Sequence, residues 1–207
     1  QVDVKLLAFR KQYGLENKFV IMYSGNIGLY YDLDNLLKVI EKFKPGTKAA
    51  DGREVAFVFV GAGAMLDKLI FYKKEHHMDN VIFIPYQEKA NLIYSLNAGD
   101  VHWVVNSKGI KGVSCPSKFY GCASSARPVL GVLEYGSEIR MIIEETGCGL
   151  VCEPEEYGAV ETNIQWFIDN AGSGKVVEMG MKGRTYLEEH LTKEISIQKY
   201  IDAIKAL

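Results

Sequence analysis

The chain has 207 residues, of which 48% are hydrophobic and 24% charged, and its formal net charge is −2. This composition excludes collagenous, disordered and disulfide-scaffold proteins, and the near-neutral net charge gives no sign of a basic field for nucleic acid or anionic membranes. The length predicts about one domain with a sizeable core. The uncharged run 55–66 is too short to span a bilayer. Because the chain begins with Gln1 rather than Met, we expect a piece of a longer protein.

Strands and helices are predicted to alternate along the chain. Short apolar runs bounded by Gly, Pro or polar residues predict strands at 19–24, 54–60, 81–84, 101–105, 129–132 and 150–152. Helical spacing of apolar residues or helix-start signals predict helices beginning near Leu33, after Gly63, near Leu92, at Pro116, after Ser137 and near Glu155. This order predicts an α/β fold: a Rossmann-like open parallel sheet of about six strands with helices on both faces.

Several single residues have a structural interpretation. Cys115, Cys122, Cys148 and Cys152 form no C-x-x-C pair and have no His at zinc-ligand spacing, so we expect reduced, mostly buried thiols. His76 and His77 are adjacent, which points them about 100° apart on a helix and disfavours a shared metal. We expect these two on the surface, Trp103 in the core, and Gly147 at the end of a helix that Ser137 caps.

Three loops are candidates for a ligand site, because ligands of open parallel sheets bind beyond the carboxyl ends of the strands. Loops 25–28 (Gly-Asn-Ile-Gly) and 61–63 (Gly-Ala-Gly) directly follow strands, and loop 115–118 (Cys-Pro-Ser-Lys) opens a helix. Glycines and free N–H groups suit phosphate, although such glycines are also ordinary turn residues. Lys118 opposes the helix dipole, which indicates an anion between them; a solvated lysine is the alternative.

No complete catalytic or nucleotide motif accompanies these loops. The third glycine of the dinucleotide fingerprint is missing after Gly63, and the P-loop, G-x-S-x-G and H-E-x-x-H motifs do not occur. Residue patterns alone therefore indicate an α/β domain compatible with phosphate binding.

Four stretches, taken in order and spacing, resemble a known family. They are GNIGLYYDLDNLL at 25–37, FVFVGAGAMLDKL at 57–69 with DNVIFIPY at 79–86, PSKFYGCASSARPVLG at 116–131, and EIRMIIEETGCGLVCEP at 138–154. Together they resemble the C-terminal, donor-binding half of family 4 glycosyltransferases with the GT-B fold. The resemblance is greatest to the branch of colanic-acid and O-antigen sugar transferases.

The resemblance implies a set of nucleotide-sugar-binding residues. The diphosphate or donor sugar would lie against Gly25, Asn26, Ile27 and Gly28, and the nucleotide cleft would be lined by Gly61 and Gly63. The uracil would meet the backbone of Tyr86, and the phosphate would be held by Ser117 and Lys118. The donor sugar would face Glu138. The chain departs from the family at Gly121, seven residues before Pro128, where a Glu usually hydrogen-bonds the ribose. Backbone or water would then meet the ribose hydroxyls.

For function, the resemblance implies the donor half of a glycosyltransferase that uses a UDP-sugar and transfers a hexosyl or N-acetylhexosaminyl group. It implies a retaining, metal-independent reaction without a cofactor, because the nucleotide sugar is a substrate, and a product that is a cell-surface polysaccharide or lipid-linked glycan. The acceptor site and catalytic base would belong to an N-terminal domain, so we expect this chain alone to be inactive.

The resemblance also implies an arrangement of the chain and its partners. Residues 1–207 would form a single domain with its core at 19–191, and 192–207 would be a C-terminal helix that packs on the N-terminal domain. The protein would be cytoplasmic, with peripheral association at the inner face of the cell membrane and no nucleic-acid partner. The alternative is a degenerate, non-catalytic Rossmann-like nucleotide-binding or regulatory module, which Gly121 keeps open.

Overall fold

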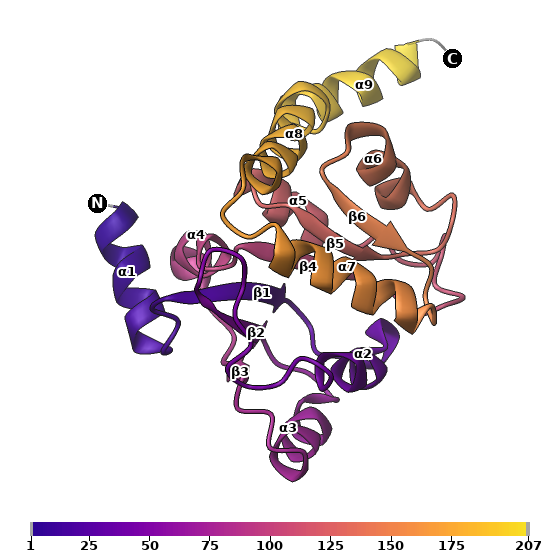
Figure 1. The fold of residues 1–207 in the computed structure, drawn as a ribbon. Coiled ribbons are helices and arrows are strands. Elements are labelled where there is room, and N and C mark those ends of the chain that lie inside the picture. Colours follow the sequence, from indigo (N-terminus) through magenta and orange to yellow (C-terminus); the bar gives the residue numbers. More distant parts are fainter. Residues whose placement is uncertain (1, 206–207) are drawn as a thin grey trace.

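The computed structural model describes residues 2–205, and within them six parallel strands form one sheet (Figure 1). The strands are β1 (Lys18–Ser24), β2 (Glu54–Val60), β3 (Val81–Ile84), β4 (Val101–Val105), β5 (Val129–Val132) and β6 (Gly149–Cys152). Their spatial order is β3-β2-β1-β4-β5-β6, and each adjacent pair is parallel. This is the doubly wound Rossmann order, in which the chain changes direction between β1 and β4. The predicted fold class is confirmed.

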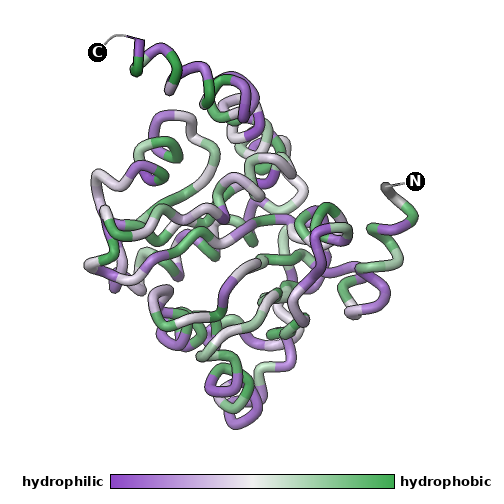
Figure 2. Tube along the Cα trace, turned by 180° about the vertical axis from the view of Figure 1, so that it is seen from behind, coloured by the Kyte–Doolittle hydropathy of each residue, from purple (hydrophilic) through white to green (hydrophobic). Residues whose placement is uncertain are grey.

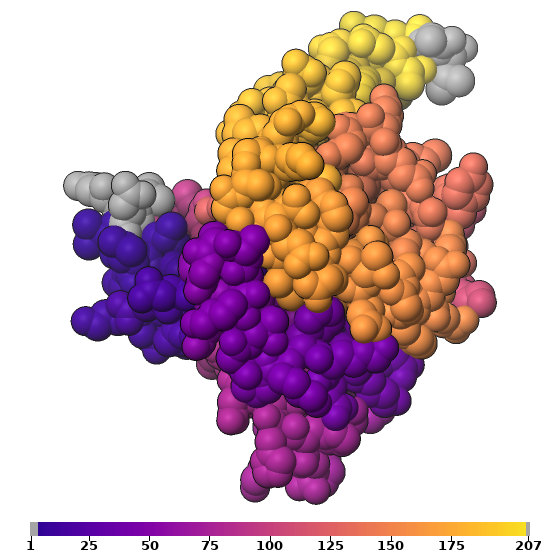
Figure 3. Space-filling model, viewed as in Figure 1, coloured from indigo at the N-terminus to yellow at the C-terminus, as the bar shows by residue number. Residues whose placement is uncertain are grey.

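Helices cover both faces of this sheet. They are α1 (Val2–Gln12), α2 (Leu33–Ile40), α3 (Leu66–Glu75), α4 (Leu92–Asn97), α5 (Lys118–Ser124), α6 (Glu138–Thr146), α7 (Tyr157–Asp169), α8 (Gly174–His190) and α9 (Lys193–Lys205). One face of the sheet packs against α2, α3 and α7, whose side chains share one core cluster. The other face has two clusters, one with side chains of α1 and α4 and one with side chains of α5, α6 and α8. Figure 3 shows α2 and α7 side by side on the near surface.

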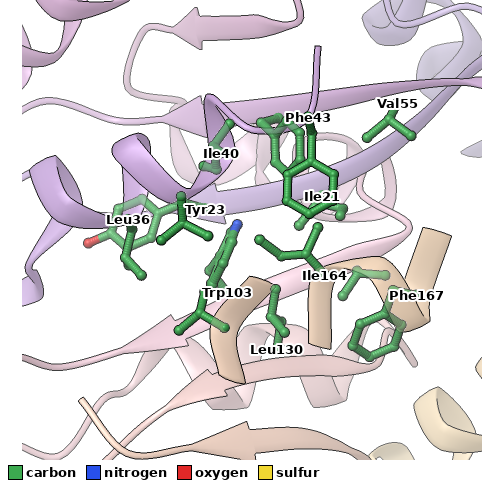
Figure 4. Close-up of a cluster of buried hydrophobic side chains, with 14 of the residues drawn as sticks. Ile21, Tyr23, Leu36, Ile40, Phe43, Val55, Trp103, Leu130, Ile164 and Phe167 are labelled. Atoms are coloured by element: carbon green, nitrogen blue, oxygen red, sulfur yellow. The ribbon is translucent and has the colours of Figure 1, made fainter. Parts of the chain in front are cut away.

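The largest core cluster forms because successive side chains of a strand point to opposite faces. Ile21 and Tyr23 of β1 face α2 and α7, together with Trp103 of β4 (Figure 4), whereas Met22 belongs to the cluster on the other face. Since both faces are buried, β1 is a continuous apolar run rather than an alternating one. The prediction that Trp103 lies in the core is confirmed, with 2% of its surface exposed.

Other local predictions have mixed outcomes. Gly147 ends α6 in the left-handed conformation (φ 66°), as predicted. Ser137 has the extended N-cap backbone, but its side chain makes no capping hydrogen bond. Pro116 was expected in the first helical turn; it instead precedes α5 by two residues, and its carbonyl accepts the Phe119 N–H at 3.1 Å. No helix is predicted from the sequence at 2–12, where the structure has α1.

The cysteine and histidine predictions agree with the structure. Cys122, Cys148 and Cys152 are buried and Cys115 is exposed, and all four are free. His76 and His77 are exposed. No helix in the described range 2–205 has the length and apolar character needed to cross a membrane.

The last helix extends away from the body of the domain. No residue of α9 is buried, and its apolar side chains Ile197, Tyr200, Ile201 and Ile204 recur at helical spacing. Figure 2 shows hydrophobic and hydrophilic residues alternating along this exposed helix. An apolar stripe of this kind is typical of a helix that packs on a partner surface. Packing of 192–207 on an N-terminal domain stays a prediction, and 206–207 lie outside the described residues.

The buried His102 predicts a loss of stability in mild acid. It is 1% exposed, its Nε2 lies 2.9 Å from the Leu96 carbonyl oxygen, and burial lowers its pKa from 6.5 to about 4. Between these values the unfolded chain binds a proton that the folded chain does not, so stability falls as the pH drops below about 6.5. We expect about 2 kcal/mol less unfolding free energy at pH 5 than at pH 7 from this group.

Urea denaturation of the wild type and of His102→Gln at both pH values measures this contribution. The exposed His77→Gln is the matched control and should keep the wild-type pH dependence. Equal losses between pH 7 and pH 5 in wild type and His102→Gln would contradict the prediction.

Candidate functional site

A pocket of about 510 Å³ opens at the carboxyl edge of the sheet, where β1, β2 and β3 end beside α4 and α5. This is the edge at which the chain reverses between β1 and β4, and such a switch point is the usual ligand site of the doubly wound fold. The residues that line the pocket are Ser24, Gly25, Val60, Gly61, Tyr86, Gln87, Lys89, Leu92, Leu96, Ser117, Lys118 and Gly121.

Backbone hydrogen bonds join the two glycine loops into one floor. The Gly25 N–H donates to the Val60 carbonyl at 2.9 Å, and the Ile27 N–H donates to the Ala62 carbonyl at 2.8 Å. In the other direction, the Met65 N–H donates to the Ile27 carbonyl at 3.0 Å. The loops after β1 and β2 therefore hold each other in place.

The glycines of the second loop are required by this loop–loop contact. Gly61 has φ 144°, and a Cβ there would lie 2.0 Å from the Gly25 carbonyl oxygen. Gly63 has φ 155°, and its Cβ would lie 2.4 Å from the Ile27 oxygen. Both the backbone conformation and the space exclude any side chain. A ligand that lies close to these glycines is the reason expected from the sequence, and the contact between the two loops is a second reason.

Lys118 brings positive charge into the pocket. The aliphatic part of its side chain lies across Gly25, so close that a Cβ on Gly25 would be 2.6 Å from Lys118 Cε. Burial lowers the pKa of Lys118 from 10.5 to about 8. Within residues 2–205, no carboxylate is among the groups that influence this pKa. Since α5 has only seven residues, the side chain rather than the helix dipole supplies most of the positive charge.

The remaining walls come from the loop after β3 and from α4. Tyr86 follows β3 and is 74% exposed at the rim. Gly121 faces α4, and a Cβ there would lie 3.3 Å from Cδ1 of Leu96. Ser117 stands at the start of α5, exposed and without a side-chain capping bond.

The structure thus separates the predicted binding residues into two groups. Those brought together in the pocket are Gly25, Gly61, Tyr86, Ser117, Lys118 and Gly121. Those outside its lining are Asn26, Ile27, Gly28, Gly63 and Glu138. The side chain of Ile27 is fully buried, so only its backbone is available to a ligand.

Glu138 lies instead in a second pocket of about 320 Å³, between loop 111–116 and the start of α6. The Glu134 carboxylate anchors the base of that loop by accepting the N–H groups of Gly109 at 3.0 Å and Lys111 at 2.9 Å. Glu138 is exposed in the first turn of α6.

Six lining residues were not among the predicted site residues: Ser24, Val60, Gln87, Lys89, Leu92 and Leu96. Gln87 and Lys89 follow Tyr86 closely, so their place after a predicted strand was an available signal. Leu92 and Leu96 have the helical spacing of core residues, and spacing does not tell a pocket wall from a core. Within the described part of the chain, no group of three or more His, Cys, Asp or Glu side chains could hold a metal ion.

Comparison with known proteins gives the family. A family model described as "Glycosyl transferases group 1" matches residues 7–110, half of the chain. The chain is 28% identical over 192 residues to the "Probable glycosyltransferase WbjE" of Pseudomonas aeruginosa, covering 93% of this chain and 45% of the relative. It is 26% identical over 205 residues to the "Putative colanic acid biosynthesis glycosyl transferase WcaI" of Escherichia coli K12, covering 98% and 47%.

The fold matches a solved structure of Anabaena HepE (Alr3699) in complex with UDP-glucose, with a TM-score of 0.78 at 13% identity over 99% of this chain and 53% of that one. The chain spans slightly less than half the length of the two curated relatives. The chain therefore belongs to the glycosyl transferases group 1 family, and its fold is that of the C-terminal domain of GT-B glycosyltransferases.

Proposed function

We propose that this chain binds the UDP-sugar donor of a glycosyltransferase in the pocket at the carboxyl ends of β1, β2 and β3. The observation that carries the proposal is the partly buried Lys118 ammonium, which lies over a floor of two glycine loops. Among the described residues, no carboxylate contributes to the shift of its pKa. A buried cation without a counter-ion is a natural partner for a diphosphate. The HepE structure in complex with UDP-glucose supports this assignment.

Each part of the donor has a place in this proposal. The diphosphate lies against Gly25 and Gly61 and is neutralised by Lys118 as the nucleotide leaves. Uracil lies beside the backbone of Tyr86 at the rim. The sugar extends toward Glu138 in the second pocket. Gly121 contributes no carboxylate, so backbone or water meets the ribose hydroxyls.

The finer assignments follow from the family resemblance. We propose transfer of a hexosyl or N-acetylhexosaminyl group, with retention and without a metal ion, to a glycan or lipid-linked acceptor. The names of the WbjE and WcaI relatives support a role in glycan biosynthesis. Acceptor binding and the catalytic base would belong to an N-terminal domain, onto which the apolar stripe of α9 would pack. Cytoplasmic location and membrane association stay predictions.

Isothermal titration calorimetry of the chain with UDP, GDP and ADP tests donor binding. We expect heat of binding with UDP and weaker or no heat with GDP and ADP. The exposed Lys175→Ala on α8 should bind UDP like the wild type. Absence of heat with all three nucleotides would contradict the proposal.

A degenerate, non-catalytic nucleotide-binding module is the second candidate, and Gly121 at the family's usual Glu position is the observation that favours it. Both candidates can bind UDP, so binding does not separate them. Sugar transfer by the chain joined to an N-terminal GT-B domain does. We expect transfer by the joined protein and none by the chain alone, whereas a degenerate module would stay inactive in both forms.

A further inference from the structure

Among the described residues, aromatic rings rather than a carboxylate lie against the Lys118 ammonium. Its Nζ lies 3.8 Å from the ring centroid of Tyr31 and 5.1 Å from that of Tyr23. Both distances are within the range of a cation–π interaction, which is strongest where water is excluded. The two rings are themselves neighbours, with centroids 6.1 Å apart and planes tilted by 59°.

This kind of partner leaves the positive charge available. A carboxylate beside Lys118 would neutralise the ammonium, and a diphosphate would have to compete with it. An aromatic face attracts the ammonium through its quadrupole but carries no net charge. The rings can therefore fix the position of the ammonium without removing the charge that an anion would meet.

Tyr31 is well anchored for this role. It ends a short 3-10 turn (Leu29–Tyr31), and the next residue, Asp32, has φ 52°. The Asp32 carboxylate accepts hydrogen bonds from Tyr157 Oη of α7 and Asn35 Nδ2 of α2, each at 2.7 Å. The turn is thus tied to two helices on one face of the sheet.

Tyr23 supports the same arrangement from the core. It is fully buried beside Leu36 and Trp103, as Figure 4 shows. Its hydroxyl donates to the Asn26 carbonyl at 2.5 Å, which ties the ring to the first glycine loop. Neither Tyr23 nor Tyr31 is among the residues that line the pocket, whereas Lys118 is. The cation–π contacts therefore connect the rings to the pocket at Lys118.

We propose that Tyr31 is a positioning residue, whose ring holds the Lys118 ammonium at the pocket so that the donor diphosphate meets a preformed positive charge. The inference rests on the proposed function, since the anion it serves is the diphosphate of the nucleotide sugar. In this proposal the turn after β1 contributes to donor binding through the Tyr31 side chain, which contacts Lys118.

Three variants test the inference. Tyr31→Leu fills similar space without a π face and should weaken UDP binding about 2- to 30-fold. Tyr31→Phe keeps the ring and should bind UDP within about twofold of the wild type. Tyr30→Leu, on the same turn but 63% exposed, is the matched control and should bind like the wild type. If Tyr31→Leu does not fold by circular dichroism, Tyr31→Met takes its place.

A second readout is independent of UDP. NMR titration of the lysine ¹³Cε resonances, assigned with Lys118→Arg, follows Lys118 in the free chain. Without the ring the charged form loses its attraction, so the Lys118 pKa should fall in Tyr31→Leu and return in Tyr31→Phe. An unchanged pKa in Tyr31→Leu would overturn the inference, as would unchanged UDP affinity where the wild type binds. If the wild type binds no UDP, the proposed function fails, and the NMR titration still decides on Tyr31.

Discussion

Replacing Lys118 with alanine is expected to weaken UDP binding about 10- to 150-fold, the value of a lost hydrogen bond to a charged group. The effect should be large because no other buried cation lines the pocket in the described residues; Lys89, the other lysine of the lining, is exposed at the rim. Calorimetry with UDP measures it, and Lys175→Ala on the outer surface of α8 is the matched lysine control. Equal affinity of Lys118→Ala and wild type would contradict the prediction.

The same lysine predicts how UDP affinity depends on pH. Its pKa of about 8 in the free chain means that much of it is neutral above pH 8. UDP binds the charged form and raises that pKa, so affinity is full below about pH 8 and falls above it. We expect about a tenfold loss between pH 7 and pH 9. Lys118→Arg stays charged and should show a flat profile; a flat wild-type profile over this range would contradict the prediction.

Much of the fold was predictable because its strands are buried on both faces. An apolar run such as 54–60 is recognised whatever it packs against, and β2 has those bounds. The helix α1 was not predicted, because apolar residues on its outer side obscure the helical pattern: Leu6 and Phe9 pack into the core, while Val4 and Leu7 are 71% and 65% exposed. Its position depends on contacts with distant parts of the chain, such as the hydrogen bond from Arg10 to the Ala98 carbonyl.

The candidate site was predictable as a set of loops but not as a set of contacts. Glycines directly after strands mark the carboxyl edge, and the fold rule places ligands there. Sequence does not show that Gly61 packs on Gly25, or that Lys118 lies over Tyr31, because those pairs come from different strand–helix units. Ile27 and Gly63 belong to these loops but do not line the pocket, and their contact with a ligand stays a prediction.

Gly61→Ala is expected to lower the unfolding free energy by about 2 to 6 kcal/mol, combining backbone strain with overpacking. The added Cβ would lie 2.0 Å from the Gly25 carbonyl oxygen, and φ 144° is a conformation that alanine rarely adopts. Because the obstacle is backbone rather than a flexible side chain, the loop after β1 would have to move. That movement would also displace Gly25 from beneath Lys118, so UDP binding should weaken in any variant that still folds.

The matched control is Gly158→Ala in the first turn of α7. Nothing lies within 4 Å of a Cβ at this position, so alanine should be neutral or add up to about 1 kcal/mol of stability. Urea denaturation of both variants at pH 7 gives the two free energies, and calorimetry with UDP gives the binding. A Gly61→Ala protein as stable as Gly158→Ala would mean that the two glycine loops are not packed against each other. The pocket floor, and the place of the diphosphate on it, would then need a different arrangement.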